Sequence, residues 1–135
     1  MCTWNNKRQR RWVKDEMGGK KGRRTFWKRY AFCKNKNGRG YRLMSWWKYS
    51  NVFGPGVMDS GRKTIRATRD RVCKAIHVFR DKPVDYIYGN SVIVPVRCEP
   101  GDLITADADA AAFRKVRLTH RAWRQAMRDI RDKLT

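Results

Sequence analysis

The residues of this chain that could do chemistry are chiefly its cysteines and histidines. The cysteines are Cys2, Cys33, Cys73 and Cys98, and no two of them form a Cys-x-x-Cys pair. A zinc site needs four soft or imidazole ligands brought together, and the one close pair is Cys73 with His77. Residues four apart in a strand share a face but lie too far apart to chelate one ion. We therefore expect no metal site.

Other familiar catalytic arrangements are not indicated either. A cysteine nucleophile needs a neighbouring base, and no local motif places His120 beside a thiol. The chain has no G-x-x-x-x-G-K-[ST] and no G-x-G-x-x-G phosphate loop. Asp102, Asp107 and Asp109 could hold a divalent cation, but such residues more often begin a helix or offset basic charge. We expect no cofactor, and we expect reduced thiols because no secretory segment is visible, with two disulfides as the alternative.

The strongest signal in the sequence is positive charge mixed with aromatic rings. The net charge is +21, and the first 48 residues contribute +14 of it, with sixteen Lys or Arg against two acids. The same 48 residues hold five of the six tryptophans. A polyanion would relieve the self-repulsion by displacing counterions, which indicates a nucleic-acid partner. A domain that is charged only for solubility is the alternative, although solubility does not require so one-sided a distribution.

The N-terminal segment is the most basic part of the chain. Residues 5–24 contain nine Lys or Arg, and only Trp12, Val13 and Met17 could anchor them. This composition predicts a loosely held basic arm, residues 1–24, which becomes ordered on a partner. The length of the remainder predicts one domain, residues 25–135.

Two aromatic-rich runs, at about 25–34 and 41–48, flank Asn37-Gly38 and predict a β-hairpin. In the first run, lysines alternate with aromatic rings on one face of the strand. That face is either a platform on which bases stack while ammonium groups meet phosphates, or a core face whose lysines extend to the rim. Phe26 and Trp27 lie on opposite faces, so one should be buried and the other available for stacking.

Further strands are predicted at about 72–79, 91–98 and 114–118. Pro95 requires an edge position or a bulge in the second of them. Residues 99–113 predict a turn followed by a short helical or irregular stretch.

A C-terminal helix is the best-defined element, and Thr119 is its predicted N-cap. Its apolar residues fall within about 140° of arc, and its arginines within about 80° on the opposite side. The apolar set is Ala122, Trp123, Ala126, Met127, Ile130 and Leu134. Arg124 and Arg128 are a like-charge pair four apart, which weakens a helix by a few tenths of a kcal/mol. The arginine stripe is therefore either a phosphate-facing surface or an ordinary solvated face.

Together these patterns predict an α+β fold: a small antiparallel sheet of about four to six strands, covered by the C-terminal amphipathic helix. The side chains expected to bind nucleic acid come from the arm, the first strand and the last helix. They are Lys7, Arg8, Arg10, Arg11, Lys20, Lys21, Arg23, Arg24, Trp27, Lys28, Arg29, Arg121, Arg124, Arg128 and Arg131.

A family resemblance covers roughly residues 41–117. The stretches that carry it are Tyr41-Arg42, Tyr49-Ser50, Gly54-Pro55-Gly56, Ala75-Ile76-His77-Val78-Phe79 and VIVPVRCEPGDLI. In this order they resemble small uncharacterised proteins of tailed phages, which are similar to the half-barrel of ADP-ribosyltransferase-like folds. The chain departs from that pattern in two places. Ala75 stands where a glycine is expected, and an alanine run at 110–112 stands where a catalytic glutamate would be sought, Glu99 being the nearest such acid.

The resemblance implies a phage-encoded protein that acts in the host cytoplasm, where it would inhibit a host or defence complex. We expect a non-enzymatic protein that binds RNA, DNA or a host nucleoprotein complex. One alternative is an ADP-ribosyltransferase-like enzyme using His77 with Tyr41 or Tyr49, and another is a structural ribonucleoprotein component. No membrane contact is expected, since no apolar run approaches 18 residues.

Overall fold

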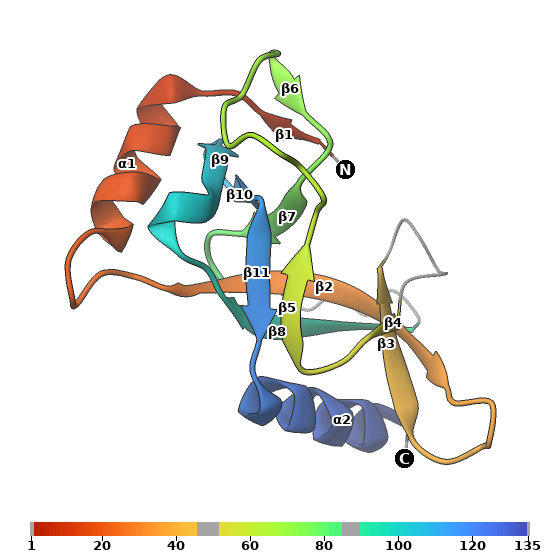
Figure 1. Ribbon diagram of the computed structural model, residues 1–135. Coiled ribbons are helices and arrows are strands. Elements are labelled where there is room, and N and C mark those ends of the chain that lie inside the picture. Colours follow the sequence, from red (N-terminus) through yellow and green to blue (C-terminus); the bar gives the residue numbers. More distant parts are fainter. Residues whose placement is uncertain (1, 46–51, 85–89, 135) are drawn as a thin grey trace.

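Figure 1 shows the computed structural model of the chain, which describes residues 2–45, 52–84 and 90–134. Within these ranges the fold is α+β, with a nine-stranded antiparallel sheet, a separate two-stranded sheet and two α-helices. The predicted class and the C-terminal helix are confirmed. The predicted sheet of four to six strands is too small, because short segments that we expected to be loops or irregular also pair as strands.

The longest strand, β2 (Thr25–Lys34), organises the large sheet. Along one edge, its first seven residues pair with β8 (Ser91–Arg97). Along the other edge, its last five residues pair with β3 (Tyr41–Ser45), and Trp27 pairs with β7 (Ile76–Phe79). One strand therefore connects three neighbours.

The turn between β2 and β3 forms where the sequence predicted it. Gly38 has a φ of 74°, in the left-handed region that glycine adopts without steric cost. The Asn37 side chain accepts the backbone N–H of Arg39 (2.9 Å). The strand predicted at 25–34 is confirmed in full. The strand predicted at 41–48 is confirmed for its first five residues, and the rest of it lies outside the described residues.

The remaining strands extend the sheet on both sides of β2 and β8, in the order β5-β11-β8-β2-β7-β10-β9. The strands of this order not yet given are β5 (Gly56–Asp59), β9 (Leu103–Ala106), β10 (Ala110–Phe113) and β11 (Lys115–Leu118). The short strand β4 (Val52–Phe53) pairs with β3 beside this order. In Figure 1, β5 and β11 run nearly at right angles to β2 and β8, so the sheet curls around its core. The strands predicted at 91–98 and 114–118 are confirmed as β8 and β11.

Pro95 lies inside β8 without disrupting it. The backbone N–H of Cys98 donates to the carbonyl of Arg24 (2.8 Å), which makes this a hydrogen-bonded pair. Such pairs alternate along an antiparallel ladder, so Pro95, three residues earlier, needs no N–H toward β2. On its other side, β8 pairs with β11 at one described residue, Arg97. The proline therefore occupies a position with an edge-like side, as its type predicts.

Residues 103–113 form a β-hairpin, so the predicted helical or irregular stretch is wrong. The carboxylate of Asp107 accepts the backbone N–H groups of Asp109 (3.0 Å) and Ala110 (2.8 Å). An aspartate that bonds the backbone ahead of it stabilises a turn. Of the alanines that suggested a helix, Ala111 and Ala112 are fully buried in β10, each in a different hydrophobic cluster.

The strand predicted at 72–79 is two strands separated by a bend. The first, β6 (Arg71–Val72), pairs with β1 (Thr3–Trp4) in the small sheet, and the second, β7, belongs to the large sheet. The N-terminus is thereby joined to the middle of the sequence (Figure 1).

A helix, α1 (Lys7–Met17), occupies 11 residues of the segment that we predicted to be a loosely held arm, residues 1–24. Val13 and Met17 lie one turn apart on the same face and are fully buried. The expectation of a loosely held segment is therefore wrong for this helix, because two apolar side chains are enough to fix it to the sheet. Deleting residues 1–24 would remove part of the core, so that deletion cannot test binding by itself.

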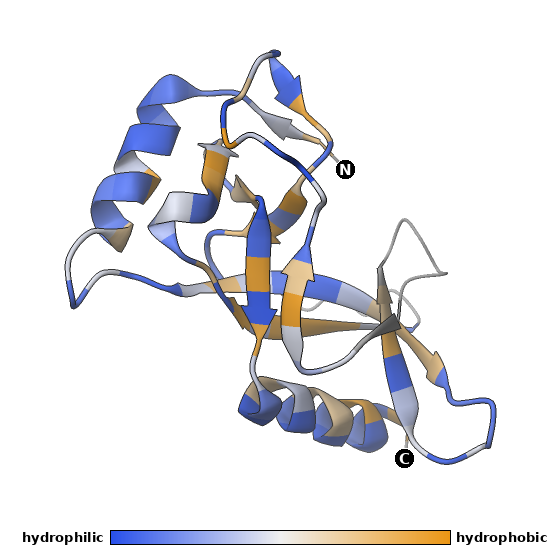
Figure 2. Cartoon of the chain, viewed as in Figure 1, coloured by the Kyte–Doolittle hydropathy of each residue, from blue (hydrophilic) through white to orange (hydrophobic). Residues whose placement is uncertain are grey.

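The C-terminal helix, α2 (His120–Leu134), begins as predicted, with the Thr119 hydroxyl accepting the backbone N–H of Ala122 (3.1 Å). Ile130 is fully buried, whereas Trp123 is only half-buried. Both helices contribute to one hydrophobic core. Figure 2 shows that hydrophobic residues concentrate on the central strands and that the outer sides of both helices are hydrophilic.

The two faces of β2 lead to a first prediction. Phe26 is 1% exposed and packs edge-on against Phe113, with ring centroids 5.1 Å apart. Trp27 is half-buried on the opposite face, with the Lys82 ammonium 5.4 Å from its ring centroid. We expect Phe26→Ala to lower the free energy of unfolding by about 3–5 kcal/mol. Trp27→Ala should cost clearly less in urea denaturation, and equal losses would show that both faces are core.

Candidate nucleic-acid interface

A compact basic loop, residues 62–74, follows β5 and includes β6, and it was not among our predicted site residues. Arg62 organises it, because its guanidinium donates to the carbonyls of Thr64 (2.9 Å), Arg66 (2.6 Å) and Lys74 (3.3 Å). These bonds bring the two ends of the loop together. Its exposed cations are Lys63, Arg66, Arg69, Arg71 and Lys74, and its exposed acid is Asp70.

The loop is joined to the N-terminal residues immediately before α1. The backbone N–H of Asn5 donates to the carbonyl of Asp70 (2.6 Å), and Trp4 pairs with Arg71 across the small sheet. The Arg71 guanidinium lies 4.4 Å from the centroid of the Trp4 indole, which is 55% exposed. An exposed ring with a cation stacked on it is therefore placed at the junction of two basic segments.

The underside of this junction is apolar and covalently fixed. Val72 is buried with Ile104 and Ala112 in a small cluster on the back of the β9–β10 hairpin. Cys2 and Cys73 form a disulfide directly beside it. Our expectation of reduced thiols is wrong for this pair, because pairing of β1 with β6 brings together two cysteines that are distant in the sequence. Cys33 and Cys98 are free thiols.

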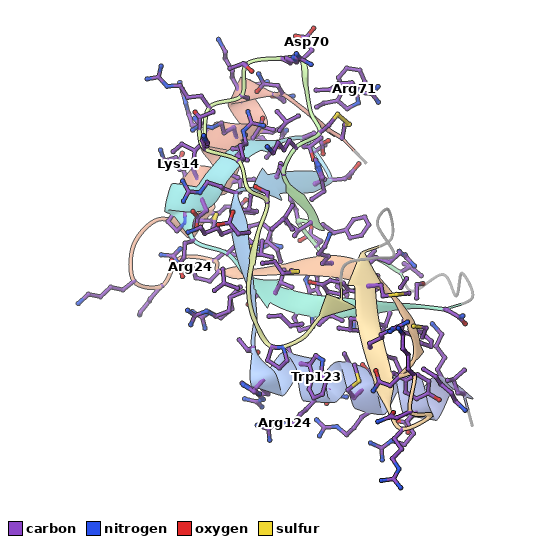
Figure 3. All side chains as sticks on the ribbon, turned by 45° about the vertical axis from the view of Figure 1, so that its right-hand side comes forward. Lys14, Arg24, Asp70, Arg71, Trp123 and Arg124 are labelled. Carbon is purple, nitrogen blue, oxygen red and sulfur yellow. A yellow bond between two sulfur atoms is a disulfide. The ribbon has the colours of Figure 1, made fainter. Side chains whose placement is uncertain are left out.

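We define the N-terminal basic surface as the exposed cations of the first half of α1 and of the loop, with Trp4. It consists of Trp4, Lys7, Arg8, Arg11, Lys63, Arg66, Arg69, Arg71 and Lys74. Figure 3 labels Asp70 and Arg71 at this end of the molecule. The first turn of α1 begins with Lys7 and Arg8 and has no acid, whereas stability favours acids at a helix N-terminus. The arrangement therefore increases positive potential at a cost in stability.

Arg10, Arg23, Arg24 and Lys28 are predicted binding residues whose side chains are engaged within the fold. Arg10 donates to the carbonyl of Ile104 (3.0 Å) and so covers the edge strand β9. Arg23 lies near Glu16 (3.7 Å), and Arg24 lies near Glu99 (3.4 Å) and donates to the carbonyl of Met17. Lys28 is the fourth, and it is described below. Arg10, Arg23 and Arg24 connect α1 to the sheet and to the residues beside it, and Lys28 contacts β7, so we do not include these four side chains in the surface.

The other predicted residues divide between the two ends of the molecule and the sheet. Lys7, Arg8 and Arg11 belong to the N-terminal basic surface, and Lys20 and Lys21 are exposed in the loop after α1. Arg29 donates to the hydroxyl of Ser91 (3.2 Å) beside the half-buried Trp27. The arginine stripe of α2 is exposed at the far end: Arg121, Arg124, Arg128 and Arg131.

Lys28 points toward the core rather than toward solvent. Its ammonium donates to the carbonyl of His77 (3.2 Å) and lies 5.7 Å from the centroid of the buried Tyr30 ring. Burial lowers the pKa of Lys28 to about 8. Since Phe26 and Tyr30 on the same face are also buried, this is a core face and the predicted stacking platform is wrong, although Lys28 does not extend to the rim as the core-strand interpretation expected.

The lowered pKa of Lys28 predicts a pH-dependent gain from Lys28→Met. An unfolded lysine keeps its proton to about pH 10.4, so the unfolded chain binds more protons at this site between about pH 8 and 10, and its contribution to stability rises with pH. We expect Lys28→Met to stabilise the protein at pH 7 by on the order of 2–3 kcal/mol. The gain should shrink toward pH 10.

The difference in the free energy of unfolding between Lys28→Met and the parent protein controls for other groups that titrate over the same pH range. Burial raises the pKa of the Cys98 thiol, which therefore ionises first in the unfolded chain and lowers stability as pH rises. This opposing effect is present in both proteins, and Lys28→Met changes it only through the weaker electrostatic interaction between the two groups, so most of it cancels in the difference. A constant difference in the free energy of unfolding from pH 7 to pH 10, measured in urea, would show that Lys28 is not charged and buried.

His77 links the N-terminus to the sheet. Its Nε2 lies 3.1 Å from the carbonyl of Cys73, an acceptor, so Nε2 bears the proton and donates. Its Nδ1 therefore accepts from the Thr3 hydroxyl (2.6 Å). Burial lowers the pKa of His77, in keeping with this neutral form. Both ring nitrogens are thus used within the fold, and Tyr49, its other possible partner in the enzyme alternative, lies outside the described residues.

Two more features concern the described residues, 2–45, 52–84 and 90–134. Among those residues, no group of three or more His, Cys, Asp or Glu side chains is placed to hold a metal ion. Across the same ranges, no helix is both long enough and apolar enough to cross a bilayer.

Comparison with known proteins adds no relative. No family model matches the chain, and no curated protein or solved structure matches it significantly. The chemistry of the surface is therefore what indicates a function.

Proposed function

We propose that this protein binds nucleic acid through the N-terminal basic surface. The observation that carries the proposal is the junction at Trp4 and Arg71, where pairing of β1 with β6 unites two basic segments from distant parts of the sequence. Neither segment needs the other's charge for packing, and together they repel. A polyanion would convert that repulsion into binding free energy by releasing counterions.

The composition of the surface favours phosphates over the carboxylates of an acidic protein. Its arginines present planar guanidinium groups that bind phosphate oxygens in pairs. The exposed Trp4 ring offers a face on which a base can stack, which is worth about 1–3 kcal/mol per base. Regularly spaced phosphates with adjacent bases would satisfy both features, whereas acidic side chains satisfy only the first.

A salt titration tests the proposal. Fluorescence anisotropy would follow binding to duplex and single-stranded oligonucleotides of DNA and of RNA. With about six phosphate contacts, affinity should fall by roughly 10³-fold or more between about 50 and 200 mM salt. A nearly flat salt dependence for all four probes would contradict nucleic-acid binding.

Narrower expectations from the sequence stay predictions. These are a phage origin, a cytoplasmic location, inhibition of a host or defence complex, and the enzyme and ribonucleoprotein alternatives. Co-purification without nuclease, followed by sequencing of the bound nucleic acid, would distinguish RNA from DNA and show whether a host ribonucleoprotein is the partner.

A further inference from the structure

A second basic surface lies at the other end of the molecule. It combines the arginine stripe of α2 with the turn between β2 and β3. The exposed cations are Lys34, Lys36, Arg39, Arg121, Arg124, Arg128 and Arg131. We call this the C-terminal basic surface.

The turn and the helix belong to one continuous surface. A shallow depression between them is lined by Asn35, Gly40, Tyr41, Trp123, Met127 and Arg131. Tyr41 and Trp123 line this depression and are half-buried, so part of each side chain is accessible to solvent. Like the N-terminal basic surface, this end therefore offers cations together with accessible aromatic rings.

The charge on α2 is more than solubility requires. Arg124 and Arg128 repel each other one turn apart, and the Arg128 guanidinium is positioned by the side-chain oxygen of Gln125 (2.8 Å). Gln125 in turn donates to the carboxylate of Asp129 (2.8 Å), which lies on the same helix. The acids of α2 thus offset only part of a stripe that costs the helix stability.

The two surfaces face away from each other. Val13 and Met17 of α1 and Ile130 of α2 are buried in the same core cluster, so each helix turns its exposed side away from that core. Figures 1 and 3 agree, with β6 and Arg71 at one end and α2 and Arg124 at the other. The strand β11 lies between them, and its four residues span about 13 Å. That exceeds the Debye length of about 10 Å at 0.1 M salt, so binding at one surface leaves the other positive.

From this arrangement we propose that the protein bridges two segments of nucleic acid, one on each basic surface. The inference rests on the proposed function, because it requires that the N-terminal basic surface binds the first segment. The second segment is recognised by the same chemistry, through phosphates on the arginines of α2 and of the turn.

Energy transfer between two labelled duplexes tests the bridging. One batch of a duplex oligonucleotide bears a donor dye and another bears an acceptor, as DNA or, if it binds tighter, as RNA. The full chain should bring both dyes together when the protein is substoichiometric, and excess protein should abolish the transfer by occupying each duplex separately. Anisotropy on the same samples reports binding of a single duplex.

Two charge-matched variants separate the surfaces. Arg124→Glu with Arg128→Glu should reduce transfer at least tenfold while a single duplex still binds with an affinity within about threefold of the parent. Lys36→Glu with Arg39→Glu should weaken transfer in the same direction without altering the helix. Arg97→Glu with Arg117→Glu changes the charge equally on exposed strand positions outside both surfaces, and should leave transfer unchanged.

The outcomes distinguish the two proposals. Binding of one duplex without transfer by the parent protein would overturn bridging and leave the proposed function intact. Transfer that survives both variants of the C-terminal basic surface would also overturn it, and sedimentation would then show whether a dimer presents two N-terminal basic surfaces instead. Failure to bind any duplex would contradict the proposed function itself.

Discussion

Replacing Arg66 and Arg69 by glutamate should weaken nucleic-acid binding by about 10²-fold or more at 0.1 M salt. Each phosphate contact contributes a slope of about −0.9 to the dependence of log K on log salt, so losing two contacts lowers affinity by nearly two orders of magnitude at that concentration. The introduced carboxylates add repulsion. The salt slope should become less steep by about two, which anisotropy titrations at several salt concentrations would measure.

Folding should be nearly unaffected, because both arginines are exposed in the loop and the bonds that fix the loop come from Arg62. The matched control is Arg97→Glu with Arg117→Glu, which changes the net charge by the same amount. If the control and the loop variant lose the same affinity, net charge attracts the nucleic acid and the N-terminal basic surface is not a specific site. A loop variant that binds as the parent does would place the binding site elsewhere.

Much of the fold could be predicted because local patterns there agree with tertiary packing. Asn37-Gly38 adopts the turn that its residues favour, and Thr119 caps the helix whose apolar arc follows it. The β-branched run of β8 forms a strand as its composition indicates. In each case, the residues that decide the structure lie within a few positions of one another.

The failures share one physical cause, which is that long-range pairing overrides a weak local signal. The alanines of β10 favour a helix in isolation, yet they form a strand because they pair with β7 on one side and with β9 on the other. The helix α1 has few apolar residues, and only the buried site that receives Val13 and Met17 makes it a stable element. A local pattern contains no information about either neighbour.

The candidate site was predicted in part for the same reason. The density of charge near the N-terminus was visible in the sequence, but the pattern does not show which cations pair internally, as Arg10 and Arg24 do. The loop from Arg62 to Lys74 could have been found by counting, since its cations greatly outnumber its acids. Its proximity to α1 could not, because it depends on pairing of β1 with β6.

Removing the disulfide should have the largest effect on stability of any change at the N-terminus. The Cys2–Cys73 bond joins residues 71 positions apart, and a closed loop of that length restricts the unfolded chain by about 4 kcal/mol in the chain-entropy model. We therefore expect Cys2→Ser with Cys73→Ser to lower the free energy of unfolding by up to about that amount. Urea denaturation of the variant and of the parent, with and without a dithiol reductant, would measure it.

The reductant supplies the control, since it should destabilise the parent to the level of the variant and leave the variant unchanged. Thiol titration of the unreduced, denatured parent should find two thiols, those of Cys33 and Cys98, and finding four would contradict the disulfide. Nucleic-acid affinity should fall together with stability. Without the bond, β1 is fixed to the fold mainly by its two-residue pairing and by the hydrogen bond of Thr3 to His77. Fraying of so short a strand would separate Trp4 from Arg71. The two basic segments of the N-terminal basic surface would then no longer be held together by the pairing of β1 with β6.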